Sequence, residues 1–251
     1  MKRRPFQGVW NIVRFNWPFY ILAIGGLLLL FAARTDFGAF AIAIDVLLFI
    51  LIGSTLLSLF VSFYVYDLSG FYELRWLDGL DDKPAGRIAN INAGFDETSG
   101  LLKEHFKNAD LAVCDFYEPS RHTEGSIKRA RKSYPPFPGT QNVSTDKLPF
   151  ETASMEKVFA IMSAHEIRDA DERRIFFAEV NRVLADGGQA IVVEHLRDPA
   201  NLLAYNVGAF HFCTRAAWLD TFKAAELHII EEKKITPFLT AFILSKNGTE
   251  Y

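Results

Sequence analysis

The sequence is poor in cysteine, and this limits the chemistry that it can support. Its 251 residues include two cysteines, Cys114 and Cys213, which are too few for a disulfide scaffold and lack the spacing of zinc ligands. We therefore expect no metal site and a reducing, cytosol-facing compartment. An excess of positive charge is also missing. The formal net charge is -3, so a nucleic-acid-binding protein, which usually carries a basic surface, is not indicated.

Charged residues are almost absent from the beginning of the chain. Residues 18–33 contain none, and residues 37–66 contain only Asp45. We interpret residues 1–66 as a membrane anchor with two transmembrane helices, at about 18–33 and 37–66. A cleaved signal peptide is less favoured, because no small-residue cleavage site follows the first apolar run and a second run comes directly after it. A buried hairpin of a soluble protein is the other alternative.

The distribution of basic residues predicts how this anchor is oriented. The turn between the runs, residues 34–36, is nearly neutral. Four basic residues precede the first apolar run: Lys2, Arg3, Arg4 and Arg14. The positive-inside rule then predicts a multi-pass protein of the inner (cytoplasmic) membrane, with its N-terminus and its C-terminal catalytic domain in the cytoplasm. Asp45 is either a functional intramembrane residue or a residue of the outer interface. Gly25, Gly26 and Gly53 predict close packing between the two helices.

Residues 67–86 are interpreted as a connector, and residues 87–251 as an α/β domain. Apolar strand patterns alternate there with helical patterns, which predicts a mostly parallel sheet with helices on both faces. The last two strand patterns, 228–235 and 239–245, predict an antiparallel pair at one edge. Residues 119–139 are basic and form either a solvated surface or a patch that attracts anionic lipid headgroups.

Five segments of this domain occur in an order and spacing that resemble the class I S-adenosylmethionine-dependent methyltransferases, in particular the branch that includes quinone-biosynthesis methyltransferases. These segments are Leu148–Phe150, Val158–His165, Glu179–Gly188, Ala190–Glu194 and Phe212–Leu219. The resemblance covers about residues 87–246. It implies a Rossmann-like methyltransferase fold, preceded here by the transmembrane hairpin, and S-adenosylmethionine as the cofactor.

The cofactor loop departs from the family pattern. The family carries three glycines after the first strand, and the matching residues 90–96 keep only Gly94. Asn92 tolerates a left-handed backbone, and Asp96 either binds the ammonium group of the cofactor or caps the next helix. By resemblance Asp115 binds the ribose hydroxyls, unless it is a cap. The other cofactor-binding residues that the resemblance implies are Phe116 and Ser144 at the adenine, and Met162 and Ser163 along the fourth strand.

Ionisable residues follow the fourth and fifth strands, where ligands bind in doubly wound sheets. His195 is the preferred general base, and His165 is the second choice. Glu194 is the third catalytic candidate in the expected pocket. Glu166, Tyr205 and His211 are further ionisable groups at the expected pocket mouth. Each histidine has a plain alternative as a solvent-facing or loop-stabilising residue.

The membrane anchor predicts the class of substrate. Tethering raises the effective concentration of an acceptor only if the acceptor lies in the bilayer. We therefore expect a hydrophobic acceptor such as a quinone or phenolic lipid, beneath a lid formed by residues 199–212. The alternative is an inactive methyltransferase-fold scaffold in a membrane complex, and a dinucleotide enzyme is disfavoured because no G-x-G-x-x-G follows the first strand. The lipid bilayer is the expected partner, nucleic acid is not, and a second copy or a biosynthetic partner protein is left open.

Overall fold

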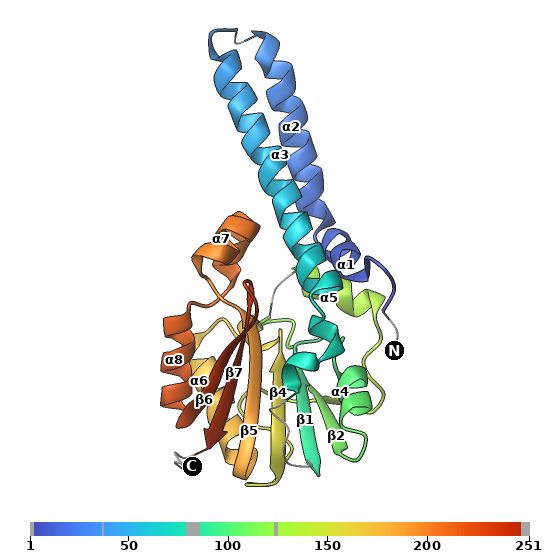
Figure 1. Cartoon of the computed structure of the whole chain (residues 1–251), viewed down its shortest axis with the longest axis vertical. Helices are drawn as coiled ribbons and strands as arrows, with labels where there is room; N and C mark the ends of the chain where they lie inside the picture. Colours follow the sequence, from blue (N-terminus) through green and yellow to red (C-terminus); the bar gives the residue numbers. More distant parts are fainter. Residues whose placement is uncertain (1–2, 37, 79–85, 123–124, 247–251) are drawn as a thin grey trace.

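The apolar N-terminal segment folds into two long helices that project from one end of a β-sheet (Figure 1). A computed structural model describes residues 3–36, 38–78, 86–122 and 125–246. Helix α2 spans Trp17–Asp36, and α3 spans Ala41–Phe63 after the short 3₁₀ turn η1, Gly38–Phe40. Both are long and apolar enough to cross a membrane. The predicted Lys2 lies outside the described residues.

Among the described residues, the hairpin has one ion pair within it, at the end that is remote from the sheet. The guanidinium of Arg34 donates to both carboxylate oxygens of Asp45, at 2.6 and 2.8 Å. This position favours the interfacial interpretation of Asp45. The predicted close packing at Gly25, Gly26 and Gly53 is wrong for the single chain, because nothing lies within 4 Å of the position that a Cβ would take at any of them.

A short amphipathic helix precedes the hairpin. Helix α1, Gln7–Phe15, begins where the carboxylate of Asp67 accepts hydrogen bonds from the amides of Gly8 and Val9, both at 2.8 Å. An acid at this position satisfies unpaired helical N–H groups and interacts favourably with the helix dipole. Only glycine fits at position 8, because a Cβ there would lie 2.3 Å from the Cβ of Tyr66. Asp67 and Tyr66 belong to η2, Tyr64–Leu68, a π-helical turn directly after α3.

The C-terminal domain is built on a seven-stranded sheet in the order β3-β2-β1-β4-β5-β7-β6. Neighbours from β3 to β5 are parallel, and β7 runs antiparallel to both β5 and β6. The strands are β1 Arg87–Asn92, β2 Asp110–Asp115, β3 Gln141–Asn142, β4 Met155–Ile161, β5 Leu184–His195, β6 Leu227–Thr236 and β7 Leu239–Lys246. The predicted α/β fold with an antiparallel edge pair is confirmed.

Two apolar cores cover the two faces of the sheet. Helices α6, Ala170–Val183, and α8, Arg215–Ala224, pack Phe176 and Trp218 into one core. Helix α4, Ser99–His105, packs Leu102 into the other. That second core also contains Phe71 and Leu77, from the 3₁₀ turns η3, Phe71–Glu73, and η4, Arg75–Leu77. The described part of the predicted connector is therefore a packed part of the fold, whereas its residues 79–85 lie outside the described part of the chain.

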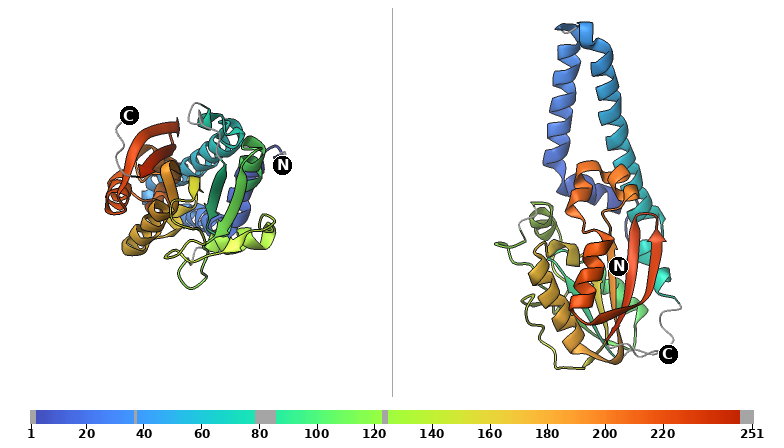
Figure 2. Two further views of the ribbon diagram at one scale, coloured as in Figure 1. Left: turned by 90° about the horizontal axis from the view of Figure 1, so that it is seen from below. Right: turned by 90° about the vertical axis from the view of Figure 1, so that its left-hand side faces the viewer.

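The carboxyl end of the sheet is covered by three further helical segments. Helix α5, Gly125–Ser133, forms within the basic segment and packs on α1. Helix α7, Pro199–Tyr205, and η6, Asn206–His211, form within the predicted lid, and α7 contacts α3 (Figure 2). The apolar hairpin and the lid thus meet over the end of the sheet where ligands bind in this class of fold.

Candidate functional site

A cavity of about 840 Å³ lies at the carboxyl ends of β4 and β5 and continues upward between α2 and α3. Its floor includes Met162, His165, Glu166 and His195. Its upper wall includes residues of both hairpin helices, among them Phe19, Tyr20, Ala23, Ser54 and Ser58. The lid contributes residues 205–208 and 210–212. One cavity therefore joins the apolar hairpin to the polar end of the sheet.

His165 is held in a network of buried carboxylates. It lies in the turn η5, Ala164–Glu166, and its Nδ1 is 2.6 Å from Oε2 of Glu194, a fully buried residue. The other oxygen of Glu194 accepts the backbone N–H of His165 at 3.2 Å. Burial opposes protonation, but the carboxylates of Glu194 and Glu166 outweigh it and raise the pKa of His165 well above its ordinary value. His165 therefore carries a proton at neutral pH and is not a free base in this state.

His195 directly follows Glu194 in β5 and, unlike His165, is neutral. Its Nδ1 donates to the carbonyl of Phe238 at 2.8 Å, so its Nε2 accepts from the hydroxyl of Tyr66 at 2.8 Å. Burial lowers the pKa of His195 to about 4, with a further contribution from the charge of His165. His195 is thus neutral near pH 7, and the Tyr66 hydroxyl lies on its proton-accepting nitrogen. The structure brings the three predicted catalytic residues together.

The turn after β1 contains the predicted cofactor residues. Gly94 has a φ of +88°, and its N–H donates to Oδ1 of Asn92 at 3.0 Å. The left-handed residue is therefore Gly94 and not Asn92, since the strand ends at Asn92. One carboxylate oxygen of Asp96 caps α4 by accepting the amides of Thr98 and Ser99, both at 2.9 Å. The side-chain amide nitrogen of Asn92 and the second oxygen of Asp96 are buried and have no hydrogen-bond partner within the described part of the chain.

Asp115 ends β2 directly beside Asn92 in the register of the sheet. One of its oxygens accepts the amide of Tyr117 at 2.9 Å, and the other pairs with the guanidinium of Arg131 on α5. Arg131 also lies against Gly94, with Nη1 2.5 Å from the position that a Cβ would take there. The carboxylate that was predicted to bind a ribose is therefore held by an arginine of the basic segment.

Three of the other predicted cofactor residues make contacts within the protein. Phe116 is 2% exposed and packs on Phe176 in the core, so its side chain does not reach the cavity. The hydroxyl of Ser163 donates to the carbonyl of Ile91 at 2.8 Å, which ties the end of β4 to β1. Ser144 hydrogen-bonds to Asp146 in the turn after β3. Met162, in contrast, lines the cavity.

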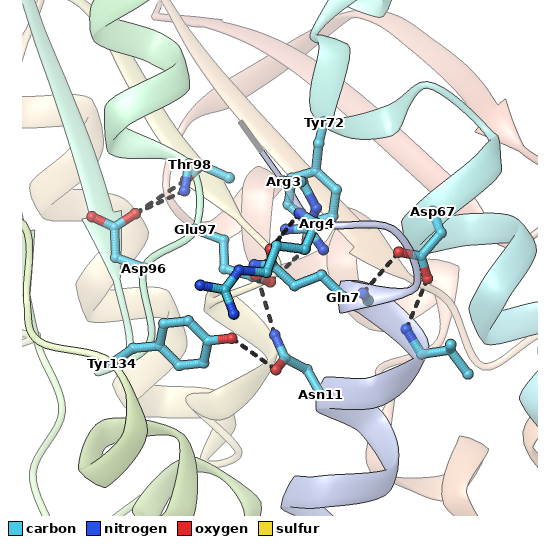
Figure 3. Close-up of polar contacts among 12 residues, drawn as sticks. Arg3, Arg4, Gln7, Asn11, Asp67, Tyr72, Asp96, Glu97, Thr98 and Tyr134 are labelled. Carbon is cyan, nitrogen blue, oxygen red and sulfur yellow. Dashed lines mark hydrogen bonds and ion pairs between the residues drawn. The ribbon is translucent and has the colours of Figure 1, made fainter. Parts of the chain in front are cut away.

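A carboxylate that the sequence analysis missed connects the cofactor turn to the N-terminus. Oε1 of Glu97 accepts from Arg3 at 2.7 Å, Asn11 at 3.3 Å and Gln7 at 3.4 Å, and Oε2 accepts from the hydroxyl of Tyr72 at 2.7 Å (Figure 3). These partners lie 25 to 94 residues away in sequence. No local pattern marks such a residue. The only sequence feature that points to Glu97 is its position directly after Asp96 in the predicted cofactor loop.

Residues 93–192 match a protein family described as a methyltransferase domain. These residues therefore form a methyltransferase domain. The matched residues extend from the turn after β1 to within β5, so they contain both the cofactor turn and His165. No curated protein sequence matches the chain.

Solved structures share the fold of the methyltransferase domain at low sequence identity. The chain is similar to the PH0226 protein from Pyrococcus horikoshii OT3, with 17% identity and a TM-score of 0.52 over 70% of this chain and 90% of that one. An S-adenosylmethionine-dependent methyltransferase from Aquifex aeolicus has 10% identity and a TM-score of 0.53 over 72% and 94%. Human N-acetylserotonin methyltransferase, solved with S-adenosylmethionine, has 12% identity and a TM-score of 0.51 over 75% and 59%.

The residues of the methyltransferase domain fit S-adenosylmethionine at the ends of β1 and β2. Gly94 allows the close approach of a ligand to the backbone. Asn92 and Asp96 present buried polar atoms without partners, and Asp115 offers a carboxylate suited to a cis-diol. The pairing of Arg131 with Asp115 means that the arginine has to withdraw before a diol reaches both carboxylate oxygens.

Proposed function

We propose that this methyltransferase transfers a methyl group to a hydrophobic acceptor that resides in the membrane, such as a quinone or phenolic lipid. The observation that carries this proposal is the continuity of the cavity. The same space is lined by Ala23 and Ser58 of the apolar helices and by His165 and His195 at the end of the sheet. An acceptor with a long apolar tail fits such a space with its tail between the helices and its polar head at the histidines.

The proposal includes insertion of α2 and α3 into the inner (cytoplasmic) membrane, with the N-terminus and the catalytic domain in the cytoplasm. Phe6, Trp10 and Trp17 expose large aromatic side chains around α1, at the level where the hairpin meets the domain. Aromatic residues favour the headgroup region of a bilayer. Basic residues of α5, such as Lys128 and Lys132, lie in the same region and attract anionic headgroups.

When it is bound, S-adenosylmethionine supplies an activated methyl group. Asn92, Asp96 and Asp115 hold it, and the hydrophobic lid of α7 and η6 excludes water from the acceptor. For a hydroxyl acceptor, the proton passes to Nε2 of His195 through the Tyr66 hydroxyl, which donates its own proton as it accepts the new one. His165 is already protonated and fixes positive charge at the cavity floor.

The alternative function, an inactive scaffold of a membrane complex, is favoured by two observations. Arg131 occupies the carboxylate of Asp115, and only one glycine is present in the cofactor turn. Calorimetric titration of S-adenosylmethionine into the detergent-purified full chain distinguishes the two functions. Saturable micromolar binding that Asp115→Ala weakens is expected for the enzyme, whereas a folded protein that binds no cofactor would be a scaffold.

The acceptor class is tested separately in proteoliposomes. Radiolabelled methyl transfer is measured with a prenylated phenol in the bilayer and with a water-soluble catechol that has the same ring. We expect at least tenfold faster transfer to the prenylated compound at equal bulk concentration, because the bilayer concentrates it beside the cavity. Equal rates would contradict a membrane-resident acceptor.

A further inference from the structure

Three side chains of types that bind transition metals meet at the floor of the cavity. They are His165 and Glu166 of η5 and His211 at the end of η6, and their ligand atoms all lie within 4.8 Å of one another. We expected no metal site because the two cysteines lack the spacing of zinc ligands. The three residues here occur in two separate segments and form no ligand-spacing motif. Folding of the lid over the sheet brings these segments together.

The distances around Glu166 match those around a metal ion. Its Oε1 is 3.4 Å from Nε2 of His165 and 3.4 Å from Nε2 of His211. Two ligand atoms at about 2.0–2.1 Å from a tetrahedral zinc ion lie about 3.4 Å apart. Two imidazole nitrogens and one carboxylate oxygen form a common ligand set for divalent transition metals, and such a set leaves positions open for substrate.

The orientation of His165 is set by a second carboxylate. Nδ1 of His165 donates its proton to Glu194, so the second proton of the imidazolium lies on Nε2 and faces Glu166; a metal ion would displace that proton and bind the same nitrogen. Glu194 is completely buried and also accepts the backbone N–H of His165, so it cannot turn away at low cost. A carboxylate behind the far nitrogen of a metal-binding histidine is the usual second layer of such sites.

An unpartnered atom provides an independent indication of a missing ligand. Oε2 of Glu166 is buried and has no hydrogen-bond partner among the described residues. A buried carboxylate oxygen without a partner is costly, and each such atom in a folded protein calls for an explanation. A cation bound between Glu166 and the two histidines would neutralise this carboxylate.

Arg168 competes with such an ion for His211. Its guanidinium donates to Nδ1 of His211. A metal ion on Nε2 requires Nδ1 to carry the proton, so Arg168 has to leave His211 when the ion binds. Removal of the arginine therefore removes both a competing hydrogen bond and a positive charge beside the site.

We propose that His165, Glu166 and His211 bind one divalent transition-metal ion of the zinc class, with an open coordination position toward the cavity. The site also deepens the proposed function, on which this part of the inference rests: a hydroxyl or carbonyl oxygen of the acceptor would take the open position. Metal binding itself does not depend on methyl transfer. The two are therefore measured separately.

The test is calorimetric titration of zinc chloride into the full chain, purified in detergent and stripped with a chelator. We expect about one equivalent with a dissociation constant in the micromolar range or below. Glu166→Gln and His211→Ala should each weaken it at least tenfold, and Arg168→Ala should tighten it at least threefold. His228→Ala, at an exposed histidine of β6, is the matched control and should leave it unchanged.

The zinc titrations either support or overturn the metal site. The melting temperature of every variant is measured first, and His211→Ala, which removes a partly exposed residue, keeps the test valid if Glu166→Gln does not fold. No binding, or binding that survives both ligand variants, overturns the metal site. Zinc binding by a chain that binds no S-adenosylmethionine would refute the proposed function and leave the metal site standing.

Discussion

At the scale of single residues, the cavity floor shows how neighbours set the charge of a histidine. His165 faces two carboxylates and is protonated, whereas His195 faces a carbonyl, an amide oxygen and a tyrosine hydroxyl and is neutral. Both are buried to a similar degree. The difference in charge therefore comes from the partners and not from burial.

The low pKa of His195 predicts an acid-sensitive contribution to stability. The folded pKa is about 4 and the ordinary value is 6.5, so unfolding is accompanied by proton uptake between these values. The contribution is complete above pH 6.5 and is lost as the pH falls toward 4, by about 3 kcal/mol over that interval. We expect the melting temperature of the wild type to fall more steeply over this range than that of His195→Gln. Parallel curves would contradict the neutral state.

The same residue should matter for turnover. We expect His195→Gln to lower methyl transfer at least tenfold, because removal of a general base reduces rates by about 10²–10⁴. The affinity for S-adenosylmethionine should not change, since His195 lies away from the ends of β1 and β2 where the cofactor is expected. Unchanged turnover in the folded variant would exclude His195 as the base.

Arg131 is expected to control the affinity for the cofactor. Because it pairs with Asp115, Arg131→Ala should free the carboxylate and lower the dissociation constant of S-adenosylmethionine at least fivefold. Calorimetry measures this directly. Lys132→Ala, at an exposed neighbour on the same helix, is the control and should have no effect. Weaker binding by Arg131→Ala would mean that the arginine holds the cofactor instead of competing with it.

At the scale of elements, the sequence predicts the sheet better than it predicts the contacts at the site. Strands β6 and β7 fall within a residue of their predicted limits, because alternating or continuous apolar runs are local patterns. The aromatic residues of η3 and η4 were placed in a connector near the membrane, although they fill one core. The pairings of Glu97 and Arg131 join distant segments, so no local pattern encodes them.

A set of polar contacts holds helix α1 and the residues before it against the methyltransferase domain. Glu97 holds Arg3, Gln7 and Asn11, and Arg3 also lies over the ring of Tyr72, 3.5 Å from its centroid (Figure 3). The side chains of Arg3 and Glu97 are 19% and 13% exposed. Loss of the carboxylate would leave a largely buried guanidinium without its anion.

We therefore expect Glu97→Ala to release the N-terminal segment and to destabilise the chain by about 2–3 kcal/mol. Limited proteolysis should then cleave within residues 3–16 in the variant and not in the wild type, and thermal melting gives the loss of stability. Glu231→Ala, at an exposed glutamate of β6, is the control. A protected N-terminus in Glu97→Ala would show that apolar contacts of α1 are sufficient to hold it.

At the scale of the whole molecule, the hairpin forms a wall of the cavity and is proposed to anchor the chain in the membrane. Ser58 of α3 lines the cavity between the helices, whereas Leu56, two residues earlier, is 61% exposed and does not line it. Replacement of either residue by phenylalanine places the same aromatic side chain on the same helix. Only the change at position 58 fills space that the acceptor tail is proposed to occupy.

We expect Ser58→Phe to reduce methyl transfer to a prenylated phenol at least tenfold in proteoliposomes, with no change in the binding of S-adenosylmethionine. Leu56→Phe should leave both properties unchanged, since its side chain faces away from the cavity. Because the substitution narrows the upper cavity and leaves the floor intact, transfer to a tailless catechol should be affected much less than transfer to the prenylated compound. Equal losses on both acceptors would mean that position 58 acts through the folding of the hairpin and that the tail does not lie between the helices.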